Sequence, residues 1–193
     1  MATMILLPDG VSGHTSHWTT YPTTFHHQNI DDDDGDTSYV QCSSDARVLN
    51  VTYADPSVAE GDISSITSVR FLSTGRHTGR SGTADVDISF LTPTAGFSET
   101  AQYDAHFSSY ETINGTSRTT SDGSSAWTYS DLENLSMKMT KDGTNQVRIS
   151  YLALEVTYEA AAGYGEDVTG VAAASIKKVT GVATANVGKV IGV

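Results

Sequence analysis

The chain has 193 residues, of which 38% are hydrophobic, and it carries a formal net charge of −12. This length supports one domain with a core and a short appendage, but not two full domains. An acidic surface repels phosphates, so the charge argues against direct binding to nucleic acid. The single cysteine, Cys42, excludes an intramolecular disulfide.

The N-terminal segment differs from a targeting signal. Its apolar run covers only Met4 to Leu7, and no basic residues precede that run, unlike in a secretory signal peptide. The longest weakly polar stretch, 168–176, is too short to span a bilayer. We therefore expect a soluble protein that is made in a cytoplasm and does not bind membranes.

Alternating patterns typical of β-strands dominate the first 160 residues. The clearest is 83–91, in which Val86, Ile88 and Phe90 alternate with polar residues, as in a strand with one face in water. Turns rich in Gly, Ser and Asp separate this segment from others of the same kind. These other strand-like segments are 46–53, 63–73 and 102–113.

The segment 146–159 is the most hydrophobic part of the chain. It is apolar at both even and odd positions, which predicts a central strand covered on both sides. Before it, Ser130 can cap a single helical turn at 131–134, because its hydroxyl can accept a hydrogen bond from a free backbone N–H.

Many short strands separated by turns predict an all-β fold, an antiparallel β-sandwich of the jelly-roll type. The strand pattern breaks at 159–167, which has the composition of a linker. We therefore expect a sandwich domain at 1–160, with 1–36 as an N-terminal arm. Residues 161–193 form a linker and a short tail.

The tail repeats an eleven-residue unit: VTGVAAASIKK, then VTGVATANVGK, then VIGV. Eleven residues match a helical period, but recurring Gly and β-branched residues disfavour a helix. The alternative is a series of short strands with Gly at the bends. Either way, so little chain cannot bury its own apolar face. We expect the tail to dock on another subunit, on its own domain or on a larger scaffold.

The residues expected to form this docking and oligomerisation interface are the apolar positions of the repeat. They are Val168, Val171, Ile176, Val179, Val182, Val187, Val190 and Val193.

The tail resembles the K-V-x-G-V-A-x-A-x-I-x-K repeats that close many virion structural proteins of tailed bacteriophages. The N-terminal half is similar to the opening of phage head- and tail-fibre modules. There, P-D-G (8–10) leads to Trp18 and to an Asp-rich turn in NIDDDDGDTSYV (29–40). A third similarity covers 124–159, from SSAWTYSDLENLSMKM to VRISYLALEVTYE.

Together these similarities frame almost the whole chain. The resemblance implies a jelly-roll, concanavalin-like sandwich on the outside of a virus particle, as a capsid decoration, a head fibre or a tail component. The family has no common catalytic residues to carry over to this chain.

The Asp-rich turn at 31–36 places five carboxylates within six residues. Hard oxygen ligands suit Ca²⁺, so Asp31, Asp33 and Asp36 are candidate metal ligands, although the spacing does not match an EF-hand loop. The alternative is a solvated turn whose Asp side chains accept hydrogen bonds from nearby backbone N–H groups. No other cofactor is expected.

Catalytic motifs are missing from the sequence. Asp85 and Asp87 share one strand face, but no opposing carboxylates complete the pair that a glycosidase requires. There is no nucleophile elbow, phosphate-binding loop or metalloprotease motif. We therefore predict a protein that is not an enzyme.

Trp127 and Tyr129 are candidate glycan contacts.

Two functional hypotheses remain. The leading one is a non-enzymatic virion structural protein, made in the host cytoplasm and displayed on the virion surface. It would be a decoration or fibre subunit attached through its apolar repeats, forming a homo-oligomer (a trimer is expected) and contacting other virion proteins. The alternative is a carbohydrate-binding, lectin-like module that attaches to host surface glycans or mucus.

Overall fold

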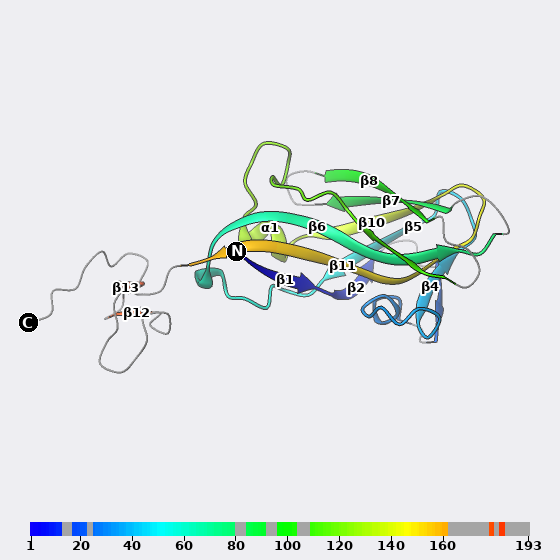
Figure 1. Ribbon diagram of the computed structural model, residues 1–193, viewed down its shortest axis with the longest axis horizontal. Coiled ribbons are helices and arrows are strands. Elements are labelled where there is room, and N and C mark those ends of the chain that lie inside the picture. Colours follow the sequence, from blue (N-terminus) through cyan, green and yellow to red (C-terminus); the bar gives the residue numbers. More distant parts are fainter. Residues whose placement is uncertain are drawn as a thin grey trace, which may run out of the picture.

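Two antiparallel sheets form the body of the molecule in the computed structural model (Figure 1). The structure describes residues 1–12, 17–22, 25–79, 84–91, 96–103, 109–161, 178–179 and 182–183. In the first sheet, sheet A, the strand order is β3-β4-β11-β6-β9, and β1 also pairs with β11. In the second, sheet B, the order is β2-β5-β10-β7-β8.

The strands of sheet A are β1 (Ala2–Leu6), β3 (Thr19–Tyr21), β4 (Tyr39–Cys42), β6 (Ile63–His77), β9 (Glu111–Asn114) and β11 (Val147–Ala160). The strands of sheet B are β2 (Pro8–Ser12), β5 (Val48–Tyr53), β7 (Ala84–Leu91), β8 (Gly96–Tyr103) and β10 (Ser136–Asp142). Short 3₁₀ turns lie at η2 (His27–Asn29) and η3 (Glu60–Asp62).

The chain crosses between the two sheets repeatedly. From β4 to β11 it passes from sheet A to sheet B and back several times, as in a jelly roll. The expected antiparallel β-sandwich is thus confirmed. The first 36 residues, expected as an arm, contribute β1 and β3 to sheet A and β2 to sheet B. Among the described residues, no helix has the length and apolar character needed to cross a membrane.

The two long strands β6 and β11 lie side by side at the centre of sheet A (Figure 1). The expected central position of 146–159 is confirmed. The expected cover on both sides is wrong for most of the strand, because one face of β11 is buried and the other is half-exposed except at Ala153. A β-bulge between Ile149 and Tyr151 shifts the alternation by one residue. Val147 and Ile149 therefore join Leu152 and the following apolar residues on the core side.

The helical turn begins earlier than expected. Helix α1 (Tyr129–Glu133) is capped by Thr128 and not by Ser130. The Thr128 hydroxyl accepts from the backbone N–H of Asp131 at 3.1 Å, and the Asp131 carboxylate accepts from the Thr128 N–H at 2.8 Å. This reciprocal capping box satisfies two N–H groups at once, which makes Thr128 the better cap.

Two short strands are described in the C-terminal repeat. They are β12 (Lys178–Val179) and β13 (Val182–Ala183), which pair antiparallel with Val179 opposite Val182. Of the helix and strand alternatives for the tail, these four residues adopt the strand. The remaining expected interface positions lie outside the described residues. They are Val168, Val171, Ile176, Val187, Val190 and Val193.

Candidate functional site

A row of long polar side chains crosses the outer face of sheet A. Side chains alternate along a strand, so Arg148 faces outward between the buried residues Val147 and Ile149. Arg148 lies opposite Gln41 of β4 on one side and opposite Arg76 of β6 on the other. Strand pairing thus places two arginines side by side on neighbouring strands.

A single carboxylate bridges these two arginines. Oδ1 of Asp36 accepts hydrogen bonds from Nη2 of Arg76 at 2.6 Å, from Nη1 of Arg148 at 3.0 Å and from the Tyr110 hydroxyl at 3.0 Å. The Arg76 side chain is only 6% exposed, whereas that of Asp36 is 57% exposed. We call these four residues, Asp36, Arg76, Tyr110 and Arg148, the Asp36 cluster.

Aromatic rings lie against both guanidinium groups. The Arg76 guanidinium lies 5.0 Å from the centre of the Tyr110 ring, and that of Arg148 lies 4.4 Å from the centre of the Tyr39 ring. Such contacts favour the cation electrostatically and hold the planar group in place. The arginines are therefore fixed both by their strands and by the rings beside them.

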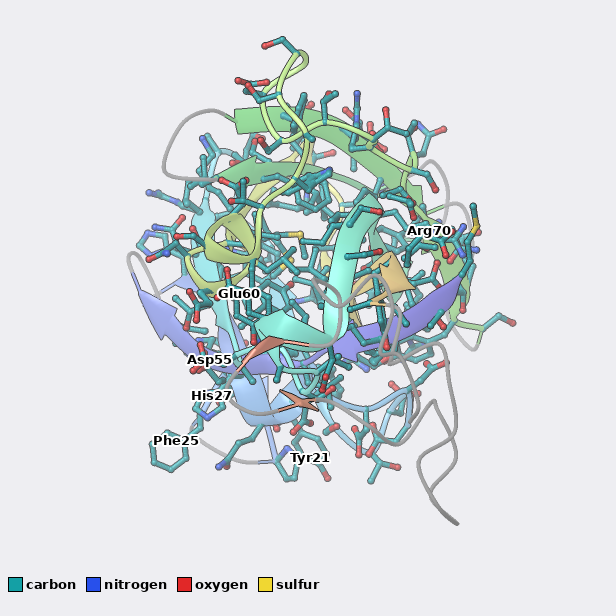
Figure 2. The ribbon with its side chains drawn as sticks, turned by 90° about the vertical axis from the view of Figure 1, so that its left-hand side faces the viewer. Tyr21, Phe25, His27, Asp55, Glu60 and Arg70 are labelled. Carbon is teal, nitrogen blue, oxygen red and sulfur yellow. The ribbon has the colours of Figure 1, made fainter. Side chains whose placement is uncertain are left out.

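The Tyr39 ring also stacks on Tyr21 of the neighbouring strand. Their ring centres are 5.4 Å apart and their planes differ by 22°. Tyr21 is 52% exposed, so much of its ring is open to solvent. Figure 2 shows Tyr21 and Phe25 projecting outward from the same side of the molecule. We call Tyr21 and Tyr39 the tyrosine pair.

The protonation states of the cluster follow from its contacts. Burial opposes ionisation of Asp36, but the hydrogen bonds from Tyr110 and the two arginines together lower the pKa of Asp36 below its ordinary value. Burial is the main reason that the pKa of Tyr110 is raised to about 12. At neutral pH Asp36 is therefore a carboxylate and Tyr110 is a phenol that can donate to it.

The Asp-rich turn positions Asp36 through contacts of its own. Oδ1 of Asp34 accepts from the backbone N–H of Ser38 at 2.9 Å and from its hydroxyl at 2.8 Å, which closes the turn. Gly35 adopts a φ of +67°, a conformation that favours glycine, and it lies against the Tyr110 ring. The backbone can then direct Asp36 toward the arginines.

The structure does not support the expected calcium site. Among the described residues, no three His, Cys, Asp or Glu side chains are grouped so that they could hold a metal ion. Asp31 forms a backbone bridge with Tyr151, and Asp36 faces the two arginines. Asp31, Asp33 and Asp36 therefore do not form such a group among the described residues. Guanidinium groups supply the positive charge that was expected from calcium.

The expected glycan contacts lie elsewhere, near the end of the sandwich that carries α1. Trp127 is 4% exposed and donates from Nε1 to the Arg118 carbonyl at 2.8 Å, so its ring is part of the core rather than an open stacking surface. Tyr129 is half-buried and its hydroxyl donates to the Val58 carbonyl. Both line a cavity of about 190 Å³ with Glu60 and residues 63–66.

Sequence reasoning did not identify the arginines or the tyrosine pair. Arg148 between two apolar residues of a strand is a local signal for an outward-facing cation. Its partners Asp36 and Arg76 come from distant parts of the chain, and only the strand register brings them together.

No protein-family model matches the chain, and no curated protein matches it. Similar solved structures include the carbohydrate-binding module TmCBM61 in complex with β-1,4-galactotriose (8% identity, TM-score 0.42, covering 77% of this chain and 87% of that one). They also include the family 11 carbohydrate-binding module of the cellulase Lic26A-Cel5E of Clostridium thermocellum (10%, 0.36, 82% and 87%). A third is the xylan-binding domain CBM22-1 of Paenibacillus barcinonensis Xyn10C (9%, 0.39, 80% and 98%). At such low identities and TM-scores, these similarities do not establish a shared family or ligand for this chain.

Proposed function

We propose that this protein is a non-catalytic saccharide-binding β-sandwich, and that the sugar binds on the outer face of sheet A beside the tyrosine pair. The observation that carries the proposal is the stacked pair itself, with Tyr21 52% exposed next to a row of hydrogen-bonding side chains. A pyranose ring has an apolar C–H face and a polar rim. An exposed aromatic ring flanked by polar groups complements both.

The polar part of the proposed site comes from three neighbouring strands. Thr19 of β3, Gln41 of β4 and Arg148 of β11 lie opposite one another in the strand register, at outward-facing positions. Nε of Arg148 donates to Oε1 of Gln41 at 3.2 Å, which orients both planar groups. Hydroxyl, amide and guanidinium groups on one face can donate to and accept from the hydroxyls of a sugar.

Two tyrosine variants test this proposal against the earlier expectation for Trp127 and Tyr129. Glycan-array screening followed by calorimetry should find a saccharide whose affinity falls about tenfold in Tyr21→Ala, because the stacking surface is lost. Tyr129→Ala is the matched control and should leave the affinity unchanged. Loss of binding in Tyr129→Ala alone would instead locate the site at the cavity near α1. Absence of saccharide binding by the wild-type protein would overturn the proposal.

The virion role inferred from the sequence resemblance is a second proposal, favoured by the repeat in the tail. Four described residues of this repeat form paired β-strands, as expected for a segment that presents valines in extended conformation. In this proposal residues 161–193 attach the sandwich to sister subunits or to a virus particle.

Truncation tests this attachment role. The last strand of the sandwich ends at Ala160, so a chain that stops at residue 161 keeps every strand of both sheets. We expect the full chain to form an oligomer and the truncated chain to be a monomer, as measured by light scattering after gel filtration. Equal masses per particle for the two proteins would contradict the role assigned to the tail.

A further inference from the structure

We infer that the two arginines of the Asp36 cluster form a binding site for the carboxylate of an acidic sugar, and that Asp36 occupies this site in the free protein. The inference rests on the proposed function, because it names the class of saccharide that the outer face of sheet A would select. The inference rests on the pattern of hydrogen bonds between Asp36 and the two arginines.

The first observation is that, within the part of the chain that the structure describes, every donor to Asp36 binds the same one of its two oxygens. Arg76, Arg148 and Tyr110 all donate to Oδ1 of this one carboxylate. A guanidinium group prefers to bind a carboxylate through two parallel hydrogen bonds to both of its oxygens. Three donors on one oxygen leave that preference unmet.

The second observation is an unsatisfied donor inside the cluster. Nε of Arg76 is buried and has no hydrogen-bond partner among the described residues. A buried donor without a partner destabilises the protein, so a ligand that binds this donor is favoured. A carboxylate that is not tethered to the chain could engage Nε and Nη2 of Arg76 together. Asp36, held by the turn, accepts a hydrogen bond from Nη2 and leaves Nε without a partner among the described residues.

The charges also do not balance locally. Two guanidinium groups meet one carboxylate, in a chain whose formal net charge is −12. Glu155, an acidic residue of β11 on the same outer face, is already paired with Arg70 at 2.7 Å, and Glu159 of the same strand is paired with the N-terminal ammonium group at 3.2 Å. Taken by themselves, the four residues of the cluster therefore carry one net positive charge, which suits a single anionic group. The acidic surface around it disfavours a long polyanion.

The arginines and the carboxylate differ in how firmly they are held. Arg76 and Arg148 stand on the two central strands and pack against the Tyr110 and Tyr39 rings. Asp36 lies on a turn and is 57% exposed. A ligand carboxylate can therefore replace Asp36 without moving the strands, and the donors are already arranged before it arrives.

The position of the cluster connects it to the proposed sugar platform. Arg148 contacts the Tyr39 ring, and Tyr39 stacks on the exposed Tyr21. Tyr39 lies between Tyr21 and Arg148 in the strand order, so an oligosaccharide that contacts Tyr21 would reach Arg148 with the carboxylate of a neighbouring sugar unit. A uronic acid within an oligosaccharide has this combination of an apolar ring face and an adjacent carboxylate.

The test compares ligands that differ only in the carboxylate. Methyl β-glucuronide and methyl β-glucoside, and matched acidic and neutral oligosaccharides on an array, are titrated against the full chain. We expect the acidic member of each pair to bind at least about tenfold more tightly, and the Nε–H signal of Arg76 in ¹⁵N NMR spectra to shift only with acidic ligands. Equal affinity for both members would overturn the inference.

Variants of the cluster provide the second part of the test. Asp36→Asn removes the internal competitor and should strengthen acidic-sugar binding about five- to tenfold without changing neutral-sugar binding. Arg148→Gln should abolish the acidic preference, and Arg148→Lys should restore only part of it, because lysine lacks the planar fork. Unchanged acidic-sugar affinity in Asp36→Asn would contradict the competition.

The outcomes separate this inference from the proposed function. If neutral and acidic sugars bind equally and Tyr21→Ala abolishes the binding of both, the saccharide site is supported and the carboxylate site is contradicted. Failure of every sugar to bind would remove both. A folding check by circular dichroism accompanies each variant, and Arg148, less buried than Arg76, serves as the principal arginine for substitution.

Discussion

The outer faces of the two sheets are both polar, but they are built differently. On sheet B, residues directly opposite each other on β7 and β8 form short hydrogen bonds: Asp87 with Thr100 at 2.6 Å, and Ser89 with Ser98 at 3.1 Å. In each pair, the two side chains satisfy each other's hydrogen-bonding groups across the strands. On sheet A, long side chains from three separate parts of the chain converge on the one carboxylate of Asp36.

Because of this difference we propose the outer face of sheet A, and not that of sheet B, as the binding face. Self-contained pairs on β7 and β8 leave little unmet hydrogen-bonding capacity for a ligand. The Asp36 cluster has more donors than its acceptor can use, and an exposed aromatic ring lies close by. Excess donors held in fixed geometry are what a polar ligand requires.

The largest expected effect comes from the backbone beneath the cluster. A Cβ at Gly75 would lie 2.8 Å from the Arg148 carbonyl oxygen and 2.7 Å from the Tyr103 ring. Gly75→Ala should therefore lower the free energy of unfolding by about 3 kcal/mol, since β6 and β11 would have to separate. Urea denaturation measures the loss. Gly61→Ala is the control, because a Cβ there meets nothing within 4 Å. Equal stability of the two variants would mean that the close approach at Gly75 is unimportant.

Substituting one Asp on each face tests the comparison directly. Asp36→Ala leaves two guanidinium groups without their shared acceptor, one of them buried, and should cost about 2 kcal/mol of stability. Asp87→Ala removes one exposed partner of Thr100 and should cost about 0.5 kcal/mol or less. Thermal unfolding of both variants gives the two values. A larger loss for Asp87→Ala would reverse the roles assigned to the faces.

Parts of this comparison could be predicted from the sequence and parts could not. The alternation in 83–91 predicts that Val86, Ile88 and Phe90 share the core side of a strand, and all three are buried in β7. The face on which Arg148 lies could not be predicted. It depends on the β-bulge after Ile149, which shifts the alternation by one residue and leaves no mark in the composition of the strand.

The cluster was harder to predict for a physical reason. The carboxylate of Asp36 was assigned to a metal because the sequence shows its acidic neighbours, whereas its true partners are distant in the chain. Residues 36, 76 and 148 meet only because β4, β11 and β6 are adjacent in one particular register. Trp127 was similarly misjudged, because an aromatic residue beside a turn has the same local pattern whether it is exposed or buried.

Removing a single hydroxyl should weaken the cluster without dismantling it. Tyr110→Phe deletes one of the three donors to Asp36 and keeps the ring against Arg76, so a loss of about 1 kcal/mol is expected. Because burial raises the pKa of Tyr110 to about 12, the folded state favours the phenol. The protonated Tyr110 hydroxyl contributes fully to stability below pH 10, and this contribution is lost as the pH rises toward 12. The difference in unfolding free energy between wild type and Tyr110→Phe should therefore shrink over this range; a constant difference would contradict the assigned donor.

The smallest expected effect is the acid dependence of Asp36, which is more than half exposed and partly screened by solvent. Its pKa in the folded protein is lowered from the ordinary value of 3.8, so its carboxylate stabilises the fold above that pH. This stabilisation is lost as the pH falls below 3.8 through the folded-state pKa. The stability advantage of the wild type over Asp36→Asn should then be constant above about pH 4 and decline as the pH falls below 3.8. Asp87→Asn, which lies beside its partner Thr100 on sheet B, is the matched control. If the advantage over Asp36→Asn persisted unchanged in acid, the arginines would be stabilised by the shape of the turn and not by the charge of Asp36, and the carboxylate would lose its role as an exchangeable ligand.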